Sequence, residues 1–154
     1  MRKHLIAASL ALLATLPAFA GEHVYDITGK TYQSECASCH IAYPPQLLPA
    51  ESWRKLMAGL AKHFGTDASV DDRIATELTR FLEQNAGGRR NAADPAAAAA
   101  PPRISTTPWF IREHRKIATS QWQSKTIGSA ANCSACHSRA DNGDYSERSL
   151  RIPR

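Results

Sequence analysis

The sequence predicts a mainly α-helical protein built from two small units and a linker. Two segments before residue 86 carry apolar side chains at the three- and four-residue spacing of an amphipathic helix. No segment of useful length alternates apolar and polar residues, as a half-buried strand does. The stretch 86–103 has paired glycines, an alanine run and several prolines without apolar periodicity, which is typical of a linker.

Residues 1–20 have the pattern of a secretory signal peptide. A positive start with Arg2 and Lys3 precedes an apolar run from Leu5 to Leu16, and Ala18-Phe19-Ala20 is a small-residue cleavage site. The apolar run is too short to span a membrane comfortably. We therefore expect cleavage after Ala20 and export to a bacterial periplasm, of a protein that is not integral to the membrane.

The charge balance argues against nucleic acid as a partner. The chain of 154 residues has a net charge of +5, and without Arg2 and Lys3 it has 17 basic and 14 acidic residues, a net charge of +3. Nucleic-acid-binding domains are usually far more basic.

The first unit, 21–85, contains the strongest helical patterns. A short helix is expected from Gly29 to Cys39, and 50–65 is the clearest helix, with Gly65 placed to end it. A third helix follows, with Ser69 and Asp72 spaced as in a capping box. The apolar stripe of 50–65 consists of Trp53, Leu56, Met57, Leu60 and Phe64, and the inward face of the third helix of Val70, Ile74, Leu78, Phe81 and Leu82.

The second unit, 104–154, shows less order in its sequence. Thr107 is a suitable helix N-cap with Pro108 in the first helical position, and Phe110, His114 and Ile117 then share a face. Little periodicity follows, so we expect loops with one short helix near the second cysteine motif. A unit of this size with few large apolar residues rarely folds without an additional cross-link or bound group.

All four cysteines lie in two copies of Cys-x-x-Cys-His, at 36–40 and 133–137. Two disulfides, a four-cysteine zinc site and covalently attached haem are the three interpretations. The adjacent histidines favour haem, because neither alternative uses them, whereas haem takes both thiols on its vinyl groups and the histidine on its iron. The sequence therefore predicts two covalently bound haem c groups, attached at Cys36, Cys39, Cys133 and Cys136, with His40 and His137 as proximal ligands.

The second axial position of each iron has few candidate ligands. His63 borders the apolar stripe of 50–65, where a haem must pack, and is favoured over Met57, which lies at the centre of that stripe as ordinary core residues do. His114 is the non-motif histidine after the linker and is favoured for the second haem. His23, close to the expected mature N-terminus, is the reserve candidate. Two histidines per iron would close both sites and lower their potentials relative to methionine ligation.

The residues around these motifs resemble a known family. GKTYQSECASCH resembles the opening of class I cytochromes c, in which a helix leads into the motif. CASCHIAYPPQLLPAESWRKLMAGLAKHFG, PWFIREHRKI, ANCSACHSRADNGDY and LRIPR are similar to segments of the small periplasmic dihaem cytochromes c that reduce an oxygen-binding, high-spin monohaem c-type cytochrome.

The resemblance implies a class I cytochrome c-like haem domain at 21–85, a smaller, loop-rich haem domain at 104–154 and bis-histidine haems. It places His63 and His114 where the distal histidines of the family are expected. The Ala/Pro-rich linker at 86–103 departs from the family pattern.

These observations favour an electron-transfer protein without catalysis of its own. It would take electrons from a membrane or quinol-linked donor and pass them to a periplasmic haem protein. The alternatives are a dihaem enzyme, such as a peroxidase or a nitrite- or oxygen-reacting protein, and an electron-entry subunit of a larger reductase. An enzyme needs an open iron, and the number of spare histidines argues against one.

Overall fold

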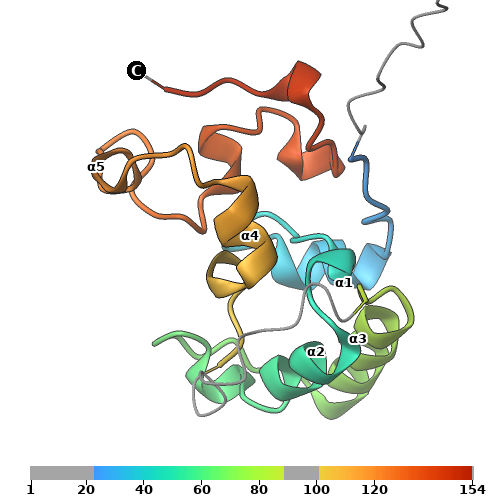
Figure 1. The fold of residues 1–154 in the computed structure, drawn as a ribbon. Coiled ribbons are helices and arrows are strands. Elements are labelled where there is room, and N and C mark those ends of the chain that lie inside the picture. The colour runs from blue at the N-terminus through green and yellow to red at the C-terminus, as the bar shows by residue number, and fades with distance from the viewer. Residues whose placement is uncertain (1–22, 89–100, 154) are drawn as a thin grey trace, which may run out of the picture.

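The computed structural model describes residues 23–88 and 101–153 (Figure 1). The predicted signal peptide and the central part of the predicted linker lie outside these residues. The described part is helical, as predicted, with isolated β-bridges instead of strands. None of its helices is long and apolar enough to cross a membrane. The α-helices are α1 (Lys30–Cys36), α2 (Ala50–Met57), α3 (Asp72–Gln84), α4 (Pro108–Glu113) and α5 (Thr119–Trp122), joined by loops and short 3-10 turns.

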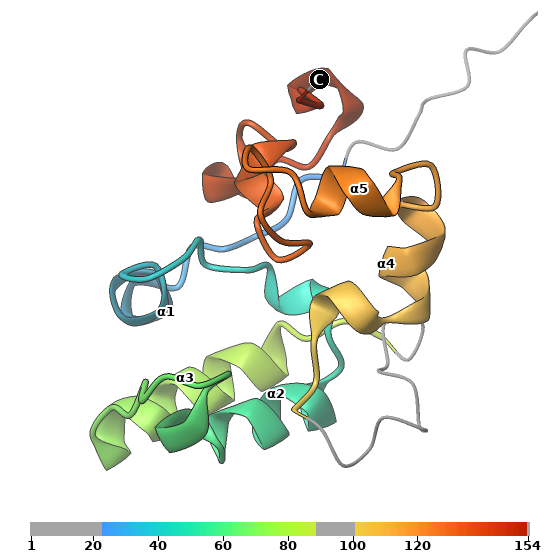
Figure 2. The ribbon, with the colours of Figure 1, turned by 90° about the vertical axis from the view of Figure 1, so that its left-hand side faces the viewer.

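The core of the first unit forms where α3 packs against α2 and α1. In both views α2 and α3 lie side by side, and α5 and the C-terminal segment lie at the opposite end of the molecule (Figures 1 and 2). The predicted inward face of α3 is confirmed, because Leu78 and Leu82 are buried and the other three residues of that face pack against them. The buried cluster consists of Tyr32, Ala42, Leu48, Trp53, Leu78 and Leu82.

The predicted N-cap of α3 is wrong by two residues. Asp71 is the N-cap, and its carboxylate accepts a hydrogen bond of 2.9 Å from the Ile74 N–H. Ser69 lies in the preceding turn, where its N–H donates to the Asp67 carboxylate. Because α3 begins at Asp72, the side chain that reaches the free amide at the third helical position is that of Asp71.

The predicted single helix over 50–65 is also wrong. Its α-helical part ends at Met57, and a 3-10 turn over Leu60–Lys62 follows Gly59. Glycine is about 1 kcal/mol less favourable than alanine inside a helix, and the Gly59 N–H already bonds at 3-10 spacing to the Leu56 carbonyl. The apolar spacing continues across this break, although Phe64 is 39% exposed rather than part of the core.

The second unit has its predicted helix and little apolar core. Thr107 caps α4 by accepting a hydrogen bond of 3.1 Å from the Phe110 N–H, and Pro108 occupies the first position, so both predictions are confirmed. Phe110, Ile127 and Ala140 are the buried apolar residues of this unit among those described.

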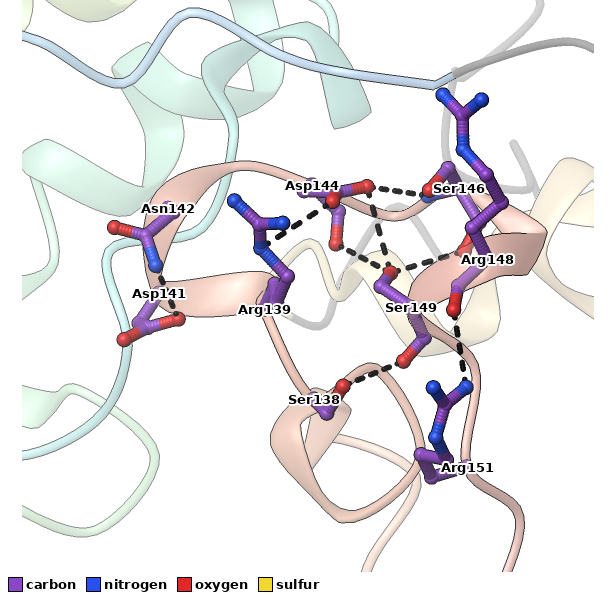
Figure 3. Close-up of polar contacts among 9 residues, drawn as sticks. All are labelled: Ser138, Arg139, Asp141, Asn142, Asp144, Ser146, Arg148, Ser149 and Arg151. Atoms are coloured by element: carbon purple, nitrogen blue, oxygen red, sulfur yellow. Dashed lines mark hydrogen bonds and ion pairs between the residues drawn. The ribbon is translucent and has the colours of Figure 1, made fainter.

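Polar contacts organise the loops near the C-terminus (Figure 3). The Asp144 carboxylate accepts a hydrogen bond of 2.9 Å from the Ser146 N–H and pairs with Arg139 at 3.6 Å. The buried Ser149 hydroxyl donates to the Ser146 carbonyl at 2.9 Å, and Ser138 donates to the Ser149 carbonyl at 2.7 Å. Hydrogen bonds thus fix a segment that has few apolar side chains to bury.

The beginning of the described chain lies against the second unit. The Tyr25 N–H donates to the Gly143 carbonyl at 2.9 Å, and the Tyr145 N–H donates to the His23 carbonyl at 2.8 Å. Gly143 has φ +74°, and a Cβ at this position would collide with the Tyr25 carbonyl oxygen, so no larger residue fits there without a shift. Backbone pairing between residues 23–25 and 143–145 therefore joins the beginning of the first predicted unit to the second.

Candidate haem sites

The first Cys-x-x-Cys-His motif begins at the end of α1, where Cys36 is the last helical residue. His40 follows in an exposed turn, and its Nδ1 hydrogen-bonds to the Ile41 carbonyl at 2.7 Å. This bond leaves Nε2 as the nitrogen available to a metal and fixes the orientation of the ring. The His40 ring faces that of His63, with ring centres 6.2 Å apart and an interplanar angle of 30°.

His63 lies beyond α2, in a sharp turn rather than on a helix. It is the C-cap of the 3-10 turn, and Phe64 and Gly65 follow with φ +49° and +98°. A positive φ is strained for a bulky residue such as phenylalanine. The Arg103 guanidinium lies over the Phe64 ring, 3.9 Å from its centre. Arg103, which directly precedes the second unit in the sequence, thus contacts the turn that presents His63.

The second motif lies in a 3-10 turn over Cys133–Ala135, in which the His137 N–H donates to the Cys133 carbonyl at 2.8 Å. The His137 ring faces that of His114, with ring centres 6.2 Å apart and an interplanar angle of 77°. His114 is held firmly at the end of α4. Its ring stacks on Phe110 at 4.0 Å, and its Nδ1 bonds to the Phe110 carbonyl at 2.9 Å.

Both histidine pairs have the spacing that one shared metal ion requires. A metal–imidazole bond is about 2 Å long and a coordinating nitrogen lies about 1 Å from its ring centre, so imidazoles on opposite sides of a metal have centres about 6 Å apart. The two separations of 6.2 Å fit this distance. Each pair could therefore hold one metal ion between its two imidazoles.

The four cysteines are free, so the structure gives no support to the disulfide interpretation. The described residues also contain no group of three or more His, Cys, Asp or Glu side chains that could hold a metal ion by themselves, as a four-cysteine zinc site would. Burial raises the pKa of the Cys36 and Cys133 thiols to about 11. Before a haem is attached, these thiols are therefore protonated at neutral pH.

The electrostatic surroundings keep two of the histidines neutral. Burial, with a smaller contribution from His40 and Arg103, lowers the pKa of His63. Burial and the proximity of His114 lower the pKa of His137, although Asp144 acts in the opposite direction. Neutral imidazole is the form that binds a metal ion.

The alternative ligands lie elsewhere. Met57 ends α2 and packs against the core of the first unit, on the side where α2 meets α3. His23 is exposed, and its ring stacks on Tyr25 with centres 6.2 Å apart. The facing pairs instead bring together the four histidines that the sequence favoured.

Two tyrosines beside the motifs were missed by the sequence analysis. The Tyr43 ring stacks on His40 with centres 4.7 Å apart, and burial raises its pKa to about 12. The Tyr145 ring lies 5.0 Å from that of His137. For Tyr43, the dipeptide Pro44-Pro45 was an available signal in the sequence, because it restricts the backbone at this point. No local pattern in the sequence indicated the role of Tyr145.

The model of the dihaem cytochrome c family matches residues 32–145, a span that includes both motifs and both histidine pairs. The chain belongs to the dihaem cytochrome c family. Electron transfer is consistent with this membership. As a dihaem cytochrome c, the protein carries two covalently bound haem c groups, and the free cysteines and paired histidines described above fit them.

Solved dihaem cytochromes c have a similar fold. The one from Shewanella baltica OS155 is 37% identical, with a TM-score of 0.68, over 80% of this chain and 92% of that chain. One from Rhodobacter sphaeroides is 37% identical, with a TM-score of 0.67, over 79% and 99% of the two chains. A second structure from that organism is 40% identical, with a TM-score of 0.62, over 77% and 98%. The search of curated proteins gave no match.

Proposed function

We propose that this dihaem cytochrome c is an electron carrier in which both irons have two histidine ligands. Cys36 and Cys39 would attach the first haem, with His40 and His63 as its ligands. Cys133 and Cys136 would attach the second, with His137 and His114 as its ligands. The observation that carries the proposal is that each motif histidine faces one other histidine at the same separation of 6.2 Å.

When bound, each haem supplies an iron that changes between the ferric and ferrous states by one electron. The residues of the chain determine whether other molecules can bind to that iron. Two cysteine sulfurs would hold each haem by thioether bonds, and the two imidazoles of each pair would bind its iron and leave no free position on it. A site closed in this way has no place for oxygen, peroxide or nitrite, so it passes electrons without binding a substrate.

The hydrogen bonds of the ligands support this role. His40 bonds through Nδ1 to the Ile41 carbonyl, and His114 bonds through Nδ1 to the Phe110 carbonyl. Such bonds orient an imidazole and increase its basicity toward the metal. In each pair one imidazole is thus anchored by a backbone carbonyl, which favours a permanent ligand over an exchangeable one.

The cellular setting belongs to the same proposal. The signal-peptide pattern at 1–20 supports export to a periplasm. There the protein would accept electrons from a membrane or quinol-linked donor and reduce a periplasmic haem protein. With two imidazoles on each iron, any chemistry on small molecules would fall to that partner rather than to this chain.

A carbon monoxide titration of the reduced protein tests the proposal. The holoprotein should bind no carbon monoxide and show low-spin spectra in both oxidation states, with two haems per chain. High-spin bands and one equivalent of bound carbon monoxide would indicate an open iron and would favour the enzymatic alternative. Co-purification with large redox subunits would instead indicate an electron-entry subunit.

A further inference from the structure

We propose that Tyr43 is a positioning residue for electron exchange between the two haems. It would fix the separation of the two haem sites and join them by a short chain of contacts. This inference rests on the ligand and attachment residues proposed above. It adds one residue that belongs to neither Cys-x-x-Cys-His motif.

The backbone of Tyr43 is anchored in the core of the first unit. Pro44 and Pro45, which follow it, are fully buried. The Tyr32 hydroxyl donates a hydrogen bond of 2.6 Å to the Tyr43 carbonyl, and the Trp53 indole N–H donates one of 2.7 Å to the Pro45 carbonyl. A proline restricts the residue before it to extended conformations. Tyr43 therefore starts from a rigid base.

The side chain of Tyr43 reaches both sites. Its ring stacks on His40, with centres 4.7 Å apart and an interplanar angle of 28°. Its hydroxyl donates a hydrogen bond of 2.8 Å to the carbonyl of Ala131, 88 positions further along the chain. Ala131 comes two residues before Cys133. One side chain thus contacts the proximal ligand of the first site and the attachment loop of the second.

The geometry of the Tyr43 contacts suits a residue that fixes the separation of the two haem sites. The stacking separation is within the range of attractive aromatic contacts, and the hydrogen bond has an ordinary O–H···O length. Electron tunnelling weakens steeply with distance and is faster through bonded and hydrogen-bonded atoms than across gaps. In the exchange one electron leaves one iron and reaches the other, so no further reactant is needed.

The other contacts between the units act differently. The backbone bonds between 23–25 and 143–145 hold the units together but do not touch His40. Tyr25 lies at the same interface, with its ring centre 5.6 Å from that of Tyr145. No hydrogen bond joins its hydroxyl to either motif among the described residues. Tyr25→Phe is therefore a matched control for Tyr43→Phe.

The test uses the holoprotein with both haems attached. The rate of electron exchange between the haems is measured by NMR line broadening in half-reduced samples, and the separation of the oxidised irons by pulsed EPR. We expect Tyr43→Phe to slow the exchange severalfold and broaden the iron–iron distance distribution, with both midpoint potentials unchanged. Tyr25→Phe should match the wild type in every readout.

A second variant separates the ring from the hydroxyl. Tyr43→Leu should slow exchange at least as much and should also shift the midpoint potential of the haem ligated by His40, but not that of the other. An unchanged exchange rate in Tyr43→Phe, in a protein with two closed low-spin haems, would overturn the inference and leave the proposed function intact. A wild type with an open iron would instead overturn the proposed function.

Discussion

The two halves of this cytochrome achieve rigidity in opposite ways. The first unit has a helical core around Leu78 and Leu82, yet His63, the distal ligand that we propose for its haem, lies on a strained turn. The second unit buries few apolar residues, yet His114, the distal ligand that we propose for its haem, is fixed by stacking and by a hydrogen bond to Phe110. The stability of each unit and the rigidity of its proposed histidine ligand therefore depend on different local contacts.

This contrast predicts that the folding of the two units depends unequally on haem attachment. This is the largest effect that we expect. Cys133→Ala/Cys136→Ala should unfold most of 104–153, because that unit lacks an apolar core of its own. Cys36→Ala/Cys39→Ala should leave α2 and α3 folded. Hydrogen–deuterium exchange read by mass spectrometry checks this segment by segment. Equal protection of both units in both variants would contradict it.

Ligand removal is the next largest effect and compares His63 with its rival Met57. His63→Ala should open one iron, so that the reduced protein binds one equivalent of carbon monoxide while the second haem stays low-spin. Met57→Ala should change the spectrum little and cost about 2 kcal/mol of packing, since Met57 is only partly buried. The measurements are a carbon monoxide titration and chemical unfolding.

His114→Ala is the matched variant in the other unit and should also bind one equivalent of carbon monoxide. A His63→Ala protein that does not react with carbon monoxide would end the assignment of His63. The same titration with Met57→Ala would show whether methionine replaces it.

Local patterns in the sequence predicted the helices but not the way in which they end. Thr107 with Pro108 and the apolar face of α3 depend on near neighbours, and the structure confirms both. The predicted helix over 50–65 failed at Gly59 because the apolar spacing continued while the backbone changed to a 3-10 turn. His63 and Met57 are therefore not two faces of one helix, as a continuous helix would make them.

The paired arrangement of the sites was predicted only in part. The favoured histidines, His63 and His114, face the motif histidines, although their role as ligands stays a prediction. The contact of Tyr43 with Ala131 and the pairing of Tyr25 with Gly143 had no signal in the sequence. Both join segments far apart in the chain, and their partners are backbone carbonyls, which every residue carries.

The polar network of the second unit should contribute a smaller, pH-dependent effect. Its hydrogen bonds from Ser146 lower the pKa of the Asp144 carboxyl, with a further contribution from Arg139. A lowered pKa in the folded state stabilises the fold above the unfolded-state value of about 3.9, and the stabilisation is lost as the pH falls through the folded-state pKa. Asp144→Asn should therefore lower the Tm by a few degrees at pH 7.

Measurements of the Tm at low pH provide the control for this prediction. The difference in Tm between Asp144→Asn and the wild type should shrink as the pH falls from about 4 through the lowered folded-state pKa, below which both proteins carry an uncharged side chain at this position. Asp141→Asn, which alters an exposed carboxylate nearby, should leave the Tm unchanged at pH 7. A difference that stays constant with pH would show that the charge of Asp144 contributes nothing.

The smallest expected effect concerns the turn that presents His63. The Arg103 guanidinium over the Phe64 ring is worth about 0.5–1 kcal/mol at an exposed site, and it holds a turn in which Phe64 has a positive φ. Arg103→Ala should therefore lower the free energy of unfolding by no more than about 1 kcal/mol.

The clearer effect of Arg103→Ala should be kinetic, because a loosened turn would let His63 leave the iron more often. Cyanide should displace His63 faster in Arg103→Ala than in the wild type, at a temperature where both are folded, and Arg103→Lys should lie between them. The second haem, whose proposed ligand His114 is held by Phe110, should react equally slowly in all three proteins. Equal rates at the first haem would show that the turn is rigid without Arg103, and that the two units hold their distal histidines equally well by different means.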